Sequence, residues 1–277
     1  MNKLSFTYAS DKEHNLAQRL VIKTIENLTG KKKLEKLYNN SLNEKINPRY
    51  LWKELLKILE IQIVNNDEVN HIIPSEGPLI VIANHPFGII DGLILCSIIA
   101  DIRADFKIMT HETLQFFPDL NQYILPVNFS KNTKSIVQSN IKIANQAKEH
   151  VLQGGVLIIF PSGSVSVAEN LKSEAKDDEW KIFPAKLIQQ TKADILPFYF
   201  EGKNGLLFHL FASKFKNQTL KYSSYIHETR RKIGKKIYVN GGNLIKYSEI
   251  SHITDRKQLT EYLKRLTYNL KDTNEFS

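Results

Sequence analysis

Short apolar runs alternate with segments of helical period from about residue 61 to the end of the chain. Strands are expected at 79–84, 105–109, 123–128, 156–160, 195–200 and 236–240. Helices are expected at 92–102, 133–152, 183–192 and 254–270. Strands that alternate with helices pair mostly in parallel, because a crossover helix returns the chain to the same end of the sheet. The sequence therefore predicts an α/β fold with a mainly parallel central sheet and helices on both faces.

The first 62 residues follow a different pattern. Leucine and isoleucine recur at helical spacing in three segments, near 11–30, 31–42 and 48–59, and Asn47-Pro48 is a helix start signal. We expect an amphipathic N-terminal helical module at 1–62 and an α/β domain at 63–277. Two compatible interpretations of the module remain open: a helical layer packed on the domain, or a surface that lies on acidic lipid.

Charge and cysteine content narrow the possible partners and compartments. The net charge is +9 and the pI is about 9.3, which suits a membrane surface, an acidic carrier protein or nucleic acid. The single cysteine, Cys96, rules out an internal disulfide and fits a reducing compartment. Neither a signal peptide nor a run of about 20 apolar residues is apparent. We expect a cytoplasmic protein that is soluble or peripheral on the inner face of the membrane.

A histidine and an aspartate flank the turn that follows the strand at 79–84. The segment reads Asn84-His85-Pro86-Phe87-Gly88-Ile89-Ile90-Asp91, and an apolar helix follows. Open α/β sheets bind ligands at such strand ends. An imidazole, with an ordinary pKa of about 6.5, can take a proton from a hydroxyl, and a carboxylate on its other nitrogen would fix its tautomer. The alternative is that Asp91 is only a helix cap and His85 an ordinary loop residue.

Two further segments join a buried strand to a glycine turn. Phe160-Pro161-Ser162-Gly163-Ser164-Val165 follows the strand at 156–160, and its hydroxyls and N–H groups could hold an anion or an oxyanion. Glu201-Gly202-Lys203-Asn204 follows the strand at 195–200. Each is also compatible with a plain strand-exit turn.

These segments together resemble the motifs of glycerolipid (lysophospholipid) acyltransferases, most closely the branch labelled hemolysin-like. The resemblance covers roughly residues 15–245, and the stretch Leu28-Thr29-Gly30-Lys31-Lys32-Lys33-Leu34, with Leu37-Tyr38 after it, resembles the N-terminal signature of that branch. Four motifs occur in the expected order, each in the expected strand context. The resemblance implies a peripheral membrane enzyme that moves a fatty acyl group from an acyl-carrier-protein or coenzyme A thioester to a lysolipid hydroxyl.

The sequence departs from the common family pattern in ways that concern the acceptor. Ser162 stands where the second motif usually has an acidic residue, and Val165 where it has an arginine that contacts the acceptor phosphate. A second such arginine is absent from the stretch at 124–129. Five residues, rather than the usual four, separate His85 from Asp91. These departures favour amino-acid lipids of the ornithine or glycine type at least as much as lysophosphatidic acid.

The resemblance also assigns roles to individual residues. His85 would be the general base and Asp91 its orienting partner, while Ser164 and the N–H groups around Gly163 would support the acceptor or the oxyanion. Substrate contacts are expected from the following residues: Asn84, Phe87, Gly88, Phe160, Pro161, Ser162, Gly163, Ser164 and Lys203. No metal and no cofactor are implied, since the thioester donor is already activated.

Two other functions remain open. The fold could serve as a non-catalytic lipid- or protein-binding module that acts through its basic surface. The run Arg230-Arg231-Lys232, with Lys235 and Lys236 close behind, could attract nucleic acid by charge, but no nucleic-acid-binding motif accompanies it, so we expect no nucleic-acid partner. The charged stretch at 172–179 is expected to be disordered, as is the tail after Lys271.

Overall fold

The computed structural model describes residues 46–65, 72–111, 118–128, 133–170, 172–209 and 218–271, with single residues before them. The first two expected N-terminal helices and the tail after Lys271 lie outside these ranges. Within the ranges, no helix combines the length and apolar character that a bilayer span requires.

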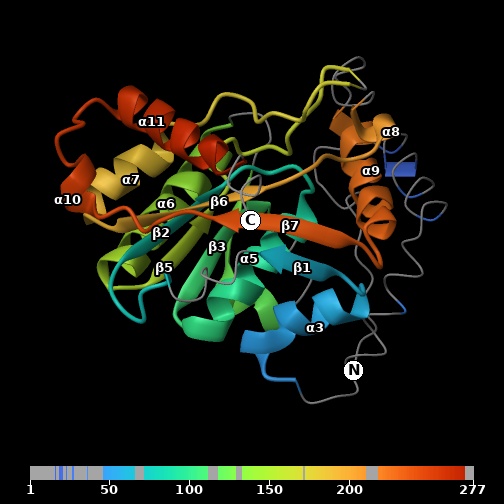
Figure 1. The fold of residues 1–277 in the computed structure, drawn as a ribbon, viewed down its shortest axis with the longest axis horizontal. Coiled ribbons are helices and arrows are strands. Elements are labelled where there is room, and N and C mark those ends of the chain that lie inside the picture. Colours follow the sequence, from blue (N-terminus) through green and yellow to red (C-terminus); the bar gives the residue numbers. More distant parts are fainter. Residues whose placement is uncertain are drawn as a thin grey trace.

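Seven strands form one sheet in the described part of the chain (Figure 1). In chain order they are β1 (Gln62–Asn65), β2 (Leu79–Ala83), β3 (Phe106–His111), β4 (Ile124–Val127), β5 (Val156–Ile159), β6 (Asp194–Phe200) and β7 (Lys236–Gly241). Their order across the sheet is β1-β7-β6-β2-β5-β3-β4. All neighbours pair in parallel except β6 and β7, which are antiparallel. The predicted mainly parallel sheet is confirmed.

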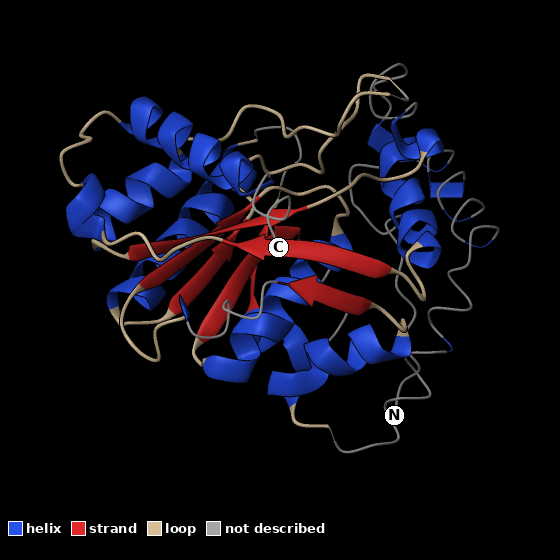
Figure 2. Cartoon of the chain, in the orientation of Figure 1, coloured by secondary structure: helices blue, strands red, loops and turns tan. Residues whose placement is uncertain are grey.

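Helices cover both faces of the sheet (Figure 2). They are α3 (Leu51–Ile58), α5 (Ile89–Ile102), α6 (Lys134–Leu152), α7 (Phe183–Thr191), α8 (Leu206–His209), α9 (Gln218–Arg231), α10 (Tyr247–Ile250) and α11 (Arg256–Asn269). Two 3-10 helices, η2 (Pro48–Tyr50) and η4 (Pro118–Tyr123), accompany them. Central strand β2 shows why two layers are needed, because it is buried on both sides. Val81 contributes to the core shared with α3 and α5, and Ile80 to the core shared with α6, α7 and α11.

Helix α3, the last of the three helices expected at the N-terminus, packs into the main core. Trp52 makes edge contacts with Phe106 and Tyr123, at centroid distances of 6.2 and 6.1 Å. The apolar side of α3 joins the cluster that α5 shares with the sheet. Lys53 of α3 also forms an ion pair, at 2.8 Å, with Asp101 at the end of α5. The helical-layer interpretation therefore describes α3, while the boundary near residue 62 stays a prediction.

The strands and helices expected within the described ranges all occur, with shifts of up to three residues at their ends. The largest shift that concerns function is at α5, which begins at Ile89 rather than at residue 92. The sequence pattern assigns no element to β1, α8, α9 or α10. Strand β1 is only four residues long, and α9 has a polar sequence with a weak periodic pattern.

Candidate active site

The three glycine-containing segments follow three adjacent strands and therefore lie at the same end of the sheet, beyond the carboxyl ends of β5, β2 and β6. Strand β2 lies between β5 and β6 and runs parallel to both, with Ile82 opposite Ile159 on one side and Pro197 on the other. The loops that follow these strands therefore leave the sheet side by side. After β2 the chain enters α5 on one face, and α7, which follows β5, lies on the other. Open α/β sheets bind ligands at such a position, beyond the carboxyl ends of adjacent strands whose helices lie on opposite faces.

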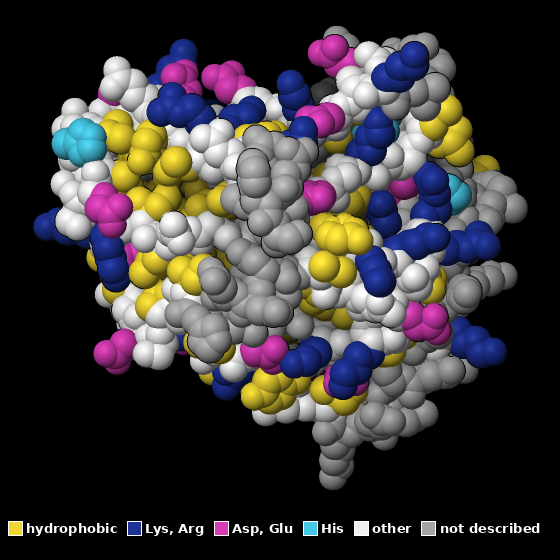
Figure 3. Space-filling model, viewed as in Figure 1, with side chains coloured by type: hydrophobic (Ala, Val, Ile, Leu, Met, Phe, Trp, Pro, Cys, Tyr) yellow, Lys and Arg dark blue, Asp and Glu magenta, His cyan; other side chains and the backbone are white. Residues whose placement is uncertain are grey.

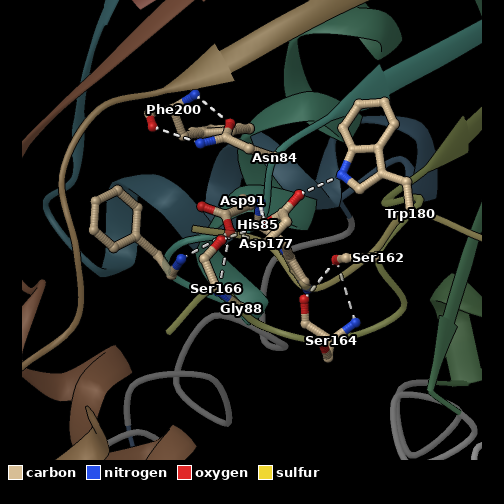
Figure 4. A network of polar contacts seen from close by, with 11 residues as sticks. Asn84, His85, Gly88, Asp91, Ser162, Ser164, Ser166, Asp177, Trp180 and Phe200 are labelled. Atoms are coloured by element: carbon tan, nitrogen blue, oxygen red, sulfur yellow. Dashed lines mark hydrogen bonds and ion pairs between the residues drawn. The ribbon is translucent and has the colours of Figure 1, made fainter. Parts of the chain in front are cut away.

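His85 and Asp91 form a hydrogen-bonded pair beyond the end of β2 (Figure 4). Nδ1 of His85 lies 2.9 Å from Oδ2 of Asp91. The His85 side chain is 17% exposed and that of Asp91 is fully buried. With Nδ1 engaged by a carboxylate, the ring presents Nε2, which has no hydrogen-bond partner among the described residues, as its other polar atom. The pair thus has the geometry of a base held by an orienting carboxylate.

Asp91 is held by the first turn of α5 itself. Its Oδ2 also accepts the backbone N–H groups of Phe87 and Gly88, at 2.9 and 3.0 Å. Asp91 is the third residue of the helix rather than a residue just ahead of it, so the expected start of the helix was wrong by three residues. Burial raises the pKa of Asp91 above its ordinary value of 3.8, and the hydrogen bonds from His85, Phe87 and Gly88 oppose that shift.

A glycine makes this turn possible. Gly88 has φ of +74° and ψ of −116°, a region that residues with a side chain rarely adopt. A Cβ atom there would also lie 3.3 Å from Cγ2 of Val165. Gly88 therefore lets the turn approach the loop after β5 while its N–H faces Asp91.

Aromatic rings enclose the pair. The Phe160 ring stacks on the His85 imidazole with centroids 3.9 Å apart and planes 20° from parallel. Phe87 is buried, and its ring faces Gly202, where a Cβ atom would be 3.0 Å from Cζ of Phe87. Such contacts fix ring orientation and contribute about 0.5–1.5 kcal/mol per aromatic pair. The second segment thus contacts His85 directly through Phe160, and the third contacts the first through Gly202 and Phe87.

Most polar groups of the turn after β5 already have hydrogen-bond partners within the protein. Gly163 donates its N–H to the carbonyl of Phe160 at 3.0 Å. Ser162 donates its hydroxyl to the carbonyl of Ser164 at 2.7 Å and accepts a longer bond, 3.4 Å, from the N–H of Ser164. Ser164 in turn donates its hydroxyl to Asp178 at 2.8 Å. Pro161 accepts the N–H of Lys181. A ligand would compete for these groups, whereas the N–H of Val165 has no acceptor among the described residues.

Asp177 is a buried carboxylate that the sequence pattern does not identify. Its Oδ1 accepts the backbone N–H of His85 at 3.1 Å and the hydroxyl of Ser166 at 2.5 Å, and its Oδ2 accepts Nε1–H of Trp180 at 2.8 Å. Ser166 also donates its N–H to the carbonyl of His85. Desolvation raises the pKa of Asp177, and these donors counteract the shift. Asp177 therefore fastens the loop after β5 to the backbone of His85.

The prediction of disorder at 172–179 was wrong. Val167 and Lys176 form an antiparallel bridge, and Asp177 receives the hydrogen bonds just described. The charged composition of this stretch concealed Asp177, because an aspartate among lysines and glutamates resembles any solvated residue. Trp180 is three positions away, but the partners that link Asp177 to the site, Ser166 and His85, lie 11 and 92 positions away in the chain.

Asn84 and Lys203 connect strand ends and loops. The Asn84 carboxamide accepts the N–H of Phe200 at 2.7 Å and donates to its carbonyl at 2.9 Å, so it joins the end of β2 to the end of β6. Lys203 donates its Nζ to the carbonyl of Ser173 at 2.6 Å. Both residues have framework contacts, and their contact with substrate stays a prediction, as do the substrate contacts expected of the other site residues.

Metal-ligating side chains are not grouped in the described part of the chain. No three His, Cys, Asp or Glu side chains there are placed to hold a metal ion.

Known proteins with similar sequences and folds are acyltransferases. Residues 42–276 match the family described as Acyltransferase. A lyso-glycine lipid O-acyltransferase of Phocaeicola vulgatus is 22% identical over 94% of this chain and 90% of its own length. A lyso-glycine lipid O-acyltransferase of Bacteroides thetaiotaomicron is 26% identical over 72% of each chain.

A solved structure has the same fold. The 1-acyl-sn-glycerophosphate (LPA) acyltransferase PlsC from Thermotoga maritima matches 91% of this chain and 94% of its own, with a TM-score of 0.51 and 14% identity. The family match includes the His85–Asp91 pair, the turn after β5 and the loop after β6. It therefore favours an enzyme over a non-catalytic binding module. This chain belongs to the acyltransferase family.

Proposed function

We propose that this acyltransferase moves a fatty acyl group from an acyl-carrier-protein or coenzyme A thioester to the hydroxyl of a lysolipid. The observation that carries the proposal is the His85–Asp91 pair at the meeting point of β2, β5 and β6, with Nδ1 bound to Asp91. A hydroxyl needs a base to attack a thioester, and a thioester needs no further activation.

In the proposed reaction, Nε2 of His85 takes the proton of the acceptor hydroxyl as its oxygen bonds to the thioester carbonyl carbon. The buried carboxylate of Asp91 stabilises the imidazolium that forms. The tetrahedral intermediate then expels the thiolate, which receives the proton from Nε2, so that an ester and a free thiol result. Backbone N–H groups of the turn after β5, including that of Val165, are the proposed donors to the oxyanion.

For the acceptor, we propose a lysolipid with an amino-acid head group ahead of lysophosphatidic acid. Two relatives are named lyso-glycine lipid O-acyltransferases. Val165 stands where the resemblance places a phosphate-contacting arginine, and its buried isopropyl group packs on Gly88 instead. A valine cannot bind phosphate, so this position does not supply that contact.

We also propose that the protein works at the inner face of a membrane. Leu206 and Leu207 on α8 are 45% and 52% exposed. Lys and Arg side chains gather where α9 and the start of β7 lie (Figure 3), and Arg230, Arg231, Lys235 and Lys236 are exposed there. Apolar side chains beside cations favour a surface with anionic lipid.

The test supplies the purified protein with acyl-carrier-protein and coenzyme A thioesters and a panel of acceptors. The panel contains lyso-glycine lipid, lyso-ornithine lipid, lysophosphatidic acid and a neutral monoacylglycerol, and mass spectrometry detects the ester. We expect acylation of at least one lysolipid, fastest for an amino-acid head group. Binding to anionic vesicles without turnover of any acceptor would contradict the proposal and favour a binding module.

A further inference from the structure

One lysine of the basic run at 230–236 differs from its neighbours. Lys232 follows the last turn of α9, and its Nζ lies 3.9 Å from the centroid of the Phe87 ring. The same Nζ donates to the carbonyl of Lys203 at 3.2 Å. Lys232 is half-buried, whereas Lys235 and Lys236 are exposed. Its side chain therefore bridges the turn after β2 and the loop after β6.

The ammonium group of Lys232 has donors to spare. An ammonium has three N–H donors, and the described residues give Lys232 one hydrogen bond, to Lys203, and no carboxylate within 4.0 Å. The nearby carboxylate of Glu228 is already engaged, by the N–H of Gly205 at 2.7 Å and by Arg231 at 3.5 Å.

Burial and the neighbouring charged residues shift the pKa of Lys232 in opposite directions. Burial lowers the pKa of Lys232; Glu228 and Asp91 raise it, and Arg231 and Lys235 lower it further. A half-buried cation without an ion-pair partner is unfavourable in the free protein. A ligand that brings a negative charge would relieve this.

We propose that Lys232 binds the anionic group of the acceptor, either the carboxylate of an amino-acid head group or the phosphate of a lysophosphatidate. This inference rests on the proposed function and adds the residue that recognises the acceptor. An amino acid joined to a fatty acid through its amino group keeps a free carboxylate, so both acceptor types share an oxyanion near the reacting hydroxyl. A lysine recognises either oxyanion as a point charge.

Proximity to the catalytic pair favours the acceptor over the donor as the source of the anion. Lys232 contacts Phe87, whose N–H is bonded to the same Asp91 oxygen that holds His85. In a lysolipid the hydroxyl and the anionic group are separated by a few bonds. In a thioester donor the phosphates lie at the far end of the pantetheine arm, remote from the carbonyl that reacts.

The experiment compares charged and neutral forms of the same acceptor. The variants are Lys232→Met, which keeps an unbranched apolar chain over Phe87, and Lys232→Arg, which keeps the charge; Lys257→Met is the matched control, since Lys257 is exposed at the start of α11, outside the basic run. The acceptors are lyso-glycine lipid and its methyl ester, and lysophosphatidic acid and monoacylglycerol.

We expect Lys232→Met to raise the KM of the anionic acceptors at least 10-fold with little change in kcat, and to leave the KM of the methyl ester and monoacylglycerol unchanged. Lys232→Arg should restore most of the lost affinity, and Lys257→Met should resemble the wild type.

Two results would overturn the inference while the proposed function stands. One is an equal loss for the anionic and neutral acceptors, which would make Lys232 a packing residue. The other is a raised KM for the thioester alone, which would assign the site to the donor's phosphates. A wild type that acylates no acceptor would instead overturn the proposed function, and the inference with it.

Discussion

At the scale of single residues, Asp91 must be both buried and ionised, and these two requirements conflict. Its carboxylate must be buried to hold Nδ1 of His85, and the same burial raises its pKa and so disfavours the ionised form. A carboxyl group whose pKa rises on folding adds most stability below its ordinary value of 3.8 and loses that contribution as pH rises through the folded value. At neutral pH the ionised Asp91 therefore lowers the free energy of unfolding.

The variant Asp91→Asn separates these two requirements, because it keeps a buried side chain of the same shape and removes the ionisable group. Oδ1 of Asp91 has no hydrogen-bond partner among the described residues, so an amide nitrogen in its place would be a buried donor without an acceptor, which costs about 1–3 kcal/mol at every pH, while the amide oxygen keeps the bonds of Oδ2. We expect acyl transfer lowered about 10³- to 10⁴-fold, and a difference in stability from the wild type that changes with pH because only the wild type can ionise at this position.

Urea unfolding between pH 4 and pH 7 tests the stability half of this prediction. The stability of Asp91→Asn relative to the wild type should increase as pH rises. A relative stability that decreases with pH would show that the ionised carboxylate stabilises the fold.

Gly88→Ala tests the positive φ of the turn. The added methyl group faces Val165 at 3.3 Å and forces a strained backbone, which costs about 1–3 kcal/mol. We expect this loss in urea unfolding together with a fall in kcat, because the turn donates to Asp91.

Gly77→Ala is the matched control for that turn. Gly77 has φ of +89°, but a Cβ atom there meets nothing within 4 Å. It should lose comparable stability without loss of kcat. If Gly88→Ala kept its full kcat, the turn would not position the catalytic pair.

At this scale the sequence predicts the His85–Asp91 pair well and its surroundings less well. The two residues lie on one strand-turn-helix segment, so six positions of local structure bring them together. Asp177, in the connection between β5 and β6, and Lys232, in the connection between β6 and β7, reach the site from positions far along the chain. Their sequence neighbours are charged, and no local pattern distinguishes them.

At the scale of elements, the site depends on three loops whose positions the strands alone do not fix. Asn84 ties the end of β2 to the end of β6, and Asp177 ties the loop after β5 to the backbone of His85. The apolar pattern predicts six of the seven strands, most clearly β2, β5 and β6, which are buried on both faces. It does not predict strand direction, so the antiparallel β7 and the short β1 paired with it emerge only from the structure.

Asp177→Asn tests the link between the loop after β5 and His85. A carboxamide has one acceptor oxygen, so its NH₂ group must face either Nε1–H of Trp180 or the donors from His85 and Ser166. One buried donor loses its acceptor, which costs about 1–3 kcal/mol. We expect reduced stability by urea unfolding, and a lower kcat with little change in KM.

The neighbouring Asp178→Asn serves as the control. Asp178 is exposed and its carboxylate accepts only the hydroxyl of Ser164, so the substitution should change stability by less than about 0.5 kcal/mol. Equal effects of the two variants would show that Asp177 has no special part in holding His85.

At the scale of the whole molecule, the two hydrophobic clusters share the central sheet. Trp52 on α3 reports on one cluster and Trp180, in the loop before α7, on the other. These are the chain's two tryptophans. Since α3 packs on α5 and on the sheet, we expect the helical segment and the α/β domain to unfold in one transition.

The variants Trp52→Phe and Trp180→Phe each leave one reporter for this prediction. In each variant, the urea midpoint from tryptophan fluorescence should equal the midpoint from far-ultraviolet circular dichroism. A fluorescence midpoint for Trp52 clearly below the circular-dichroism midpoint would show that α3 detaches first and belongs to a separate unit.

The central claim is that His85 is the base of the acyl transfer. The most direct measurement is the rate of acceptor-dependent thiol release from the acyl thioester, for the wild type, His85→Ala and the control His252→Ala, whose histidine is exposed. We expect His85→Ala to lose at least about 10³-fold in rate with its fold intact by circular dichroism, and His252→Ala to match the wild type. A folded His85→Ala protein that releases thiol at the wild-type rate would contradict the claim.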